Sequence, residues 1–100
     1  MSVKPETTLG KHVMDRLKAE GGMWFKTHGG AFQIVGLPDI VGCYKGRFIS
    51  MELKQPGKEP TLIQWKRILA IKKVGGRSWY CTNVAEAIAI RDGINFTVGD

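Results

Sequence analysis

The stretch GLPDIVGCYKGRFISMELK, residues 36–54, decides the fold of this chain and leads to its function. Its alternation of apolar and polar residues around Lys-Gly predicts two strands joined by a tight turn. Successive side chains of a strand point to opposite faces of the sheet. Glu52 and Lys54 therefore leave one face, while Met51 and Leu53 leave the other, apolar face.

Two carboxylates and an ammonium group on one side of a sheet are poor material for a core. Asp39, which follows Pro38, and Glu52 supply the carboxylates, and Lys54 lies about two strand rises, ~6–7 Å, beyond Glu52. Mg²⁺ prefers oxygen ligands and takes one or two carboxylates. The strand geometry also brings the backbone carbonyl of Leu53 within reach. The pattern therefore predicts a divalent metal site at which Lys54 assists a water molecule or neutralises charge on a phosphate.

Each of these residues also has an ordinary interpretation. Asp39 after a proline is typical of a turn, and Glu52 with Lys54 is typical of the solvated side of a half-exposed strand. For either feature taken alone the ordinary interpretation is the better one. Their occurrence together, in the Gly-Leu-Pro context, favours the metal site.

Composition indicates one globular domain, residues 1–100, with 43% apolar and 24% charged residues. The net charge of +6 favours a polyanionic partner, nucleic acid before an anionic membrane. Cys43 and Cys81 form neither a CxxC nor a disulfide framework, so we expect small buried thiols in a reducing cytoplasm. No apolar signal segment or membrane span is visible, and we expect a soluble cytoplasmic protein.

Periodicity and glycine punctuation predict the element order α-β-β-β-α-β-α, an α/β fold with a mixed sheet. The expected helices are residues 5–20, 61–74 and 84–91, and the expected strands are residues 23–27, 39–44, 47–54 and 77–82. Residues 33–35 are expected to begin the second strand before Gly36 interrupts it. The last seven residues alternate and predict a short edge strand or a frayed end.

The helical stripes predict which side chains enter the core. We expect these to be Leu9, Val13 and Leu17 in the first helix and Leu62, Trp65, Ile68 and Leu69 in the second. The tryptophans Trp24, Trp65 and Trp79 are expected to be core residues and not stacking platforms.

The ordered set Gly36-Leu37-Pro38-Asp39, Met51-Glu52-Leu53-Lys54 and Gln64 resembles the PD-(D/E)xK nuclease superfamily, and most closely its virus-type replication-repair nuclease (VRR-NUC) family. The resemblance covers roughly residues 6–82. It implies a restriction-endonuclease-like core, with a mixed central sheet flanked by helices, and a single VRR-NUC nuclease domain over residues 1–100.

The resemblance also implies two supporting residues. Gln64 would lie beside the catalytic lysine and help to position water or phosphate, although Thr61-x-x-Gln64 is itself a helix-capping box. The family's helical glutamate would be Glu6, which extends the inward stripe of the first helix and would reach the metal through water. Glu20, at the other end of that helix, is the rival position.

Several basic residues are candidates for DNA contacts. They are Lys26 and His28 near the first strand, Lys45 and Arg47 at the hairpin turn, and Lys58 in the loop after the site. For each of them taken alone, a solvated surface side chain is the better interpretation.

Together these features predict a Mg²⁺- or Mn²⁺-dependent endonuclease that hydrolyses DNA phosphodiesters. A chain this small has no separate recognition module, which favours structure-selective cleavage. The resemblance to small phage and bacterial VRR-NUC proteins implies a homodimeric Holliday-junction resolvase acting on four-way DNA. The alternative is a catalytically inactive DNA-binding module with the same fold.

Overall fold

The computed structural model describes residues 5–27 and 35–99, with Pro5 and Glu6 described by their backbone alone. Its elements are α1 (Pro5–Ala19), β1 (Met23–Lys26), β2 (Ile40–Tyr44), β3 (Arg47–Leu53), α2 (Leu62–Lys73), β4 (Arg77–Cys81) and α3 (Val84–Asp92). This is the predicted element order. Residues 33 and 34 lie outside the described residues, and the second strand begins at Ile40. None of the described helices is long and apolar enough to cross a membrane.

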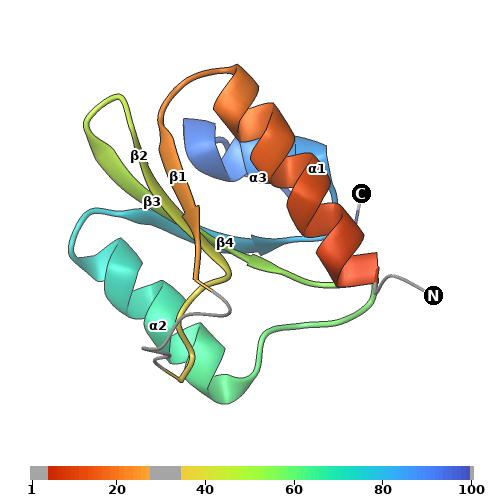
Figure 1. Ribbon diagram of the computed structural model, residues 1–100. Coiled ribbons are helices and arrows are strands. Elements are labelled where there is room, and N and C mark those ends of the chain that lie inside the picture. Colours follow the sequence, from red (N-terminus) through yellow and green to blue (C-terminus); the bar gives the residue numbers. More distant parts are fainter. Residues whose placement is uncertain (1–4, 28–34, 100) are drawn as a thin grey trace.

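The four strands form one mixed sheet in the order β1-β2-β3-β4. The first three are antiparallel neighbours, and β4 runs parallel to β3 after the crossover through α2. Figure 1 shows α1 and α3 on one side of the sheet and α2 on the other. The predicted mixed sheet flanked by helices is therefore confirmed.

The alternation along β3 divides the interior into two parts. Ile49, Met51 and Leu53 join the main hydrophobic core beneath α1 and α3. Ser50 and Glu52 point to the opposite face, where the Ser50 hydroxyl donates to Ser78 of β4 at 2.7 Å. Polar side chains, Ser50 and Glu52, therefore occupy the buried β3 positions on the α2 side.

The predicted inward face of α2 is partly wrong. Ile68 is fully buried, but Leu62 and Leu69 are 73% and 55% exposed. Trp65 packs edge-on against Trp79 and Tyr80 of β4. The helix therefore turns Trp65, Ile68 and the polar Gln64 toward the sheet, which leaves the leucines on other sides. An apolar stripe alone did not reveal that a glutamine takes an inward position.

The prediction that both cysteines are buried is correct for Cys81 and wrong for Cys43. Burial raises the pKa of the Cys81 thiol far above its ordinary value. Cys43 lies opposite Met23 and Phe48 in the strand register, and both of these are also exposed. Helix α2, which covers this side of the sheet, packs against β4. The half of this sheet face that β1 and β2 form is therefore left open.

The C-terminal segment neither adds a strand nor frays within the described residues up to Gly99. Gly93 ends α3 in the left-handed conformation, with φ 71°, and the chain turns back there. The buried carboxylate of Glu86 accepts the Gly99 N–H at 2.6 Å and the Thr82 N–H at 2.6 Å. One side chain of α3 therefore holds the tail, so no strand pairing is required.

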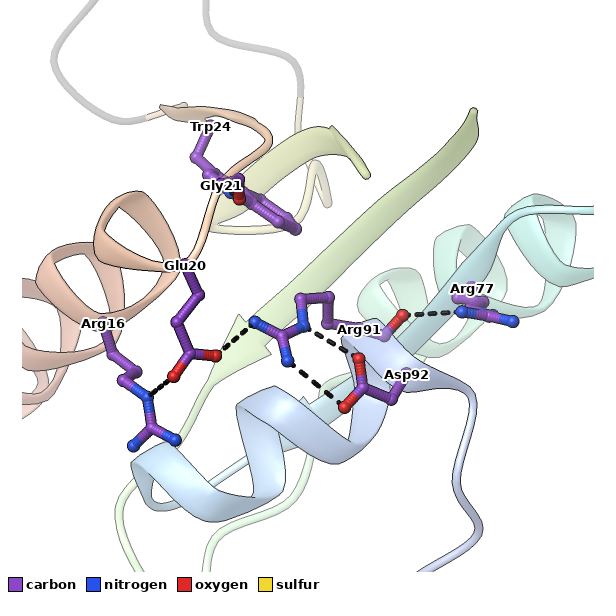
Figure 2. Close-up of polar contacts among 7 residues, drawn as sticks. All are labelled: Arg16, Glu20, Gly21, Trp24, Arg77, Arg91 and Asp92. Atoms are coloured by element: carbon purple, nitrogen blue, oxygen red, sulfur yellow. Dashed lines mark hydrogen bonds and ion pairs between the residues drawn. The ribbon is translucent and has the colours of Figure 1, made fainter. Parts of the chain in front are cut away.

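A buried cation joins the two helices that cover the main core (Figure 2). Arg91 of α3 donates to Glu20 at 2.7 Å and to Asp92 at 2.9 Å, and its guanidinium lies 4.6 Å from the centre of the Tyr44 ring. Glu20 also pairs with Arg16. Its hydrogen bonds to Arg91 and then to Arg16 lower the pKa of the Glu20 carboxyl.

This lowered pKa predicts a pH-dependent effect of Glu20→Gln. The carboxylate contributes stability above its ordinary pKa of 4.5, and the contribution disappears as the pH falls through the lower folded-state value. Glu20→Gln should therefore lower the urea midpoint at pH 7, and the difference from the unsubstituted protein should shrink toward pH 3. Glu59→Gln, at an exposed position, is the control. A deficit of equal size at both pH values would contradict the prediction.

Candidate metal and nucleic-acid site

Asp39 is fixed at the point where the β2–β3 ladder ends. The last paired residues are Ile40 and Met51. Beyond them the Asp39 Oδ2 atom accepts the Leu53 N–H at 2.7 Å, so a side chain supplies the acceptor for this backbone amide. Asp39 is only 8% exposed. Its carboxylate is thus anchored at the end of β3, immediately beside Glu52.

The backbone of the Pro-Asp pair is held from β1. Thr27 donates its N–H to the Asp39 carbonyl at 3.0 Å and its hydroxyl to the Pro38 carbonyl at 2.5 Å. Sequence reasoning did not single out Thr27. Its only local signal is a hydroxyl directly after a strand, and the partners lie eleven and twelve positions away.

Glu52 lies on the α2 side of β3 and is 3% exposed. Its Oε1 atom accepts a hydrogen bond from Gln64 Nε2 at 3.0 Å. The other end of the same amide completes the capping box of α2, because Gln64 Oε1 accepts the Thr61 N–H at 2.8 Å. The two interpretations of Gln64 are compatible, since its oxygen caps the helix and its nitrogen contacts the carboxylate.

Lys54 follows the last residue of β3 and is half-buried. Its backbone N–H donates to the Cys81 carbonyl at 3.0 Å, which continues the β3–β4 pairing by one residue. By the alternation of the strand its side chain leaves on the same face as that of Glu52. The structure thus gathers Asp39, Glu52 and Gln64, with Lys54 next along this edge.

The two candidate helical glutamates have different surroundings. Glu6 lies one turn before Gly10 of α1, and a Cβ added to Gly10 would stand 3.2 Å from the Leu53 side chain. The N-terminal half of α1 therefore lies beside the end of β3, which carries the candidate site. Glu20, the rival, is occupied by Arg16 and Arg91 near the opposite end of the helix (Figure 2).

The candidate DNA contacts are distributed over both ends of the sheet. Lys26 closes β1 opposite Ile40, with its Nζ atom near Gly10 of α1, and the exposed Lys58 lies in the loop after Lys54. Arg47, which begins β3, lies about 20 Å from Leu53, given six strand intervals of about 3.3 Å, and Lys45 precedes it in the hairpin turn. His28 lies outside the described residues.

The donor set at this edge suits a hard cation. It consists of two carboxylates on one sheet face and a backbone carbonyl, and all of these are oxygen donors. Among the described residues no group of three or more His, Cys, Asp or Glu side chains forms a metal cage. Mg²⁺ and Mn²⁺ tolerate such a partial set because water and substrate oxygens complete their coordination. The residues present therefore fit the ion that the sequence predicted.

Comparison with solved structures decides which fold this is. A structure described as a VRR_NUC domain superposes with a TM-score of 0.72 over 90% of this chain and 97% of its own chain, at 18% sequence identity. This chain has the VRR-NUC fold. The fold predicted from the Pro-Asp and Glu-x-Lys motifs is thereby confirmed. No protein-family model matches the sequence, and no curated protein does.

The two functions of the Gln64 amide can be separated by stability measurements. Thr61→Ala removes half of the capping box and should cost about 0.5–2 kcal/mol. Gln64→Ala removes the other half and also the donor to buried Glu52, which should cost about 1–3 kcal/mol more. Urea unfolding at pH 7 measures both variants. Equal losses would show that the contact with Glu52 contributes nothing to the stability of the folded protein.

Proposed function

We propose that the chain is a Mg²⁺- or Mn²⁺-dependent endonuclease that hydrolyses DNA phosphodiesters. The observation that supports this most is the pair of buried carboxylates, with Asp39 held by the Leu53 N–H and Glu52 held by the Gln64 amide. Two adjacent carboxylates repel each other and repel DNA, so a binding surface alone has no use for them. A divalent cation reverses both effects.

Each residue of the site has a role in this proposal. Asp39, Glu52 and the Leu53 carbonyl would hold the ion, with Glu6 acting through water. The bound ion supplies an activated water molecule and neutralises charge on the phosphate. Lys54 orients or deprotonates the attacking water and stabilises negative charge on the phosphoryl oxygens.

Gln64 acts on the site through another residue. Its Nε2–H fixes Glu52 Oε1 in one orientation, and the capping box fixes Gln64 itself. A carboxylate held in this way does not have to reorganise when the cation arrives. Gln64 is therefore a positioning residue, and any contact it makes with water or phosphate is additional.

The substrate follows from the charge of the chain. A net charge of +6 attracts the DNA backbone, and Lys26, His28, Lys45, Arg47 and Lys58 are candidate phosphate contacts. Backbone contacts of this kind are independent of base sequence and fit cleavage by DNA shape. We therefore propose branched DNA, and in particular the four-way junction, cut by a two-fold homodimer that places one site at each of two strands.

Glu52→Gln tests the chemistry without removing the hydrogen-bond acceptor for Gln64. The variant should fold and bind four-way DNA, but metal-dependent cutting should fall by a factor on the order of 100 or more, since a charged group is lost from the reacting centre. Glu59→Gln, in the adjacent loop, is the matched control and should cut normally. Cutting by Glu52→Gln at the unsubstituted rate would refute the site. DNA binding without metal-dependent cutting by the unsubstituted protein would favour the inactive module.

A substrate panel tests the specificity. Duplex, flap, splayed-arm and four-way DNA are incubated with Mn²⁺ at catalytic protein concentrations, and the products are resolved on denaturing gels. Symmetric nicks confined to the four-way substrate are expected, together with a dimer mass by light scattering. Equal cutting of all four substrates, or a monomer that resolves junctions, would contradict the proposed specificity or assembly.

A further inference from the structure

A basic pocket lies at the end of the sheet opposite the candidate metal site. A pocket of about 510 Å³ opens where β3 and β4 begin, between the C-terminal ends of α2 and α3. Three cationic side chains from three elements line it, namely Arg47 of β3, Lys72 of α2 and Arg77 of β4. Its apolar wall includes Trp79 and Phe96. This pocket is separate from Asp39 and Glu52, which lie at the opposite end of β3.

Neighbouring groups hold two of the three cations in place. The Lys72 ammonium lies over the Trp79 ring, 4.5 Å from its centre. Arg77 Nη1 donates to the Arg91 carbonyl at 2.7 Å. The guanidinium also packs on Gly93, where an added Cβ would stand 2.7 Å from Arg77 Nε. Lys72 and Arg77 are therefore directed at the pocket by packing.

No acidic side chain among the described residues lines the pocket. The nearest candidate, Asp92, precedes Gly93, but Arg91 binds both of its carboxylate oxygens, at 2.9 and 3.2 Å. Basic residues in a last helical turn often only offset the helix dipole, and this would account for Lys72. It does not account for Arg47, which comes from a strand. The convergence of charge therefore indicates an anionic ligand.

The connection to the candidate nuclease site indicates which anion. The first turn of α2 contains Gln64, which binds Glu52, and its last turn contains Lys72, which lines the pocket. The twelve residues of the helix span about 18 Å. This helix contains no acidic residue. The phosphates of one strand repeat about every 3.4 Å along a duplex, so a DNA strand that leaves the cleavage site along α2 reaches the pocket after about five nucleotides.

We propose that the pocket of Arg47, Lys72 and Arg77 binds a backbone phosphate of the substrate DNA, with the adjoining sugar against its apolar wall. The inference rests on the proposed nuclease function and adds a second contact remote from the chemistry. Phosphate contacts of this kind fix the register of the DNA on the protein. The pocket would thus orient the arm of a branched substrate relative to the scissile bond.

The salt dependence of binding tests this proposal. Fluorescence anisotropy with labelled four-way DNA, in EDTA to prevent cutting, gives the slope of log affinity against log salt. Each phosphate contact contributes about 0.9 to this slope. Because the pocket holds one phosphate, Arg47→Gln/Lys72→Gln should reduce the magnitude of the slope by about one, and each single substitution should reduce it by less. Lys11→Gln/Lys18→Gln, two exposed positions on α1, lowers the net charge equally and should leave the slope unchanged.

Two results would overturn the proposal. One is a salt-dependence slope for the Arg47→Gln/Lys72→Gln variant that equals the slope for the Lys11→Gln/Lys18→Gln variant. The other is that Lys72→Gln weakens the binding of a deoxynucleoside monophosphate but leaves the salt-dependence slope for DNA unchanged. That result would identify the pocket as a small-molecule site. Because EDTA removes catalysis, the binding result stands apart from cutting. A protein that binds DNA through the pocket yet never cuts with Mn²⁺ would contradict only the proposed chemistry.

Discussion

The hydrogen bond from the Leu53 amide to Asp39 is the constraint on which the candidate site depends. The β2–β3 ladder stops at the pair of Ile40 and Met51, so the backbone of β2 cannot accept the Leu53 N–H. The Asp39 carboxylate takes it at 2.7 Å and is thereby placed beside Glu52. The same bond satisfies a buried backbone donor. One side chain thus completes the sheet edge and fixes the first carboxylate.

The second carboxylate is fixed from the other side of the crossover. The capping box with Thr61 sets the start of α2, and this start places Gln64 where it can bind Glu52. Lys54 in turn requires β4, since its amide bonds to Cys81. Hydrogen bonds from β1, β4 and α2 therefore converge on the ends of β2 and β3. The geometry of the site is a property of the whole sheet.

The sequence was sufficient for the fold because its signals are periodic and local. Alternation around Lys45-Gly46 specifies the hairpin, and glycines mark the ends of the helices. It also singled out Asp39 and Glu52, because the two motifs occur together in the Gly-Leu-Pro context although each alone has an ordinary explanation. It missed Thr27, because a hydroxyl contact across eleven positions depends on tertiary packing.

The errors share a physical cause. Apolar character predicts that Leu62, Leu69 and Cys43 are buried. Helix α2 packs against β4, however, and covers only part of the sheet face on its side, so these three residues stay exposed. Which half of a face a helix covers is set by the crossover and by polar anchors such as Gln64. Residue hydropathy has no information on that choice.

The dual use of the Gln64 amide has a consequence for biosynthesis. A ribosome releases β2 and β3 before it releases α2 and β4, so an emerging chain carries Asp39 and Glu52 without Gln64 or the Cys81 carbonyl. Such a chain lacks the supports that orient its acidic pair. The two carboxylates therefore reach their supported geometry only after most of the polypeptide has been translated.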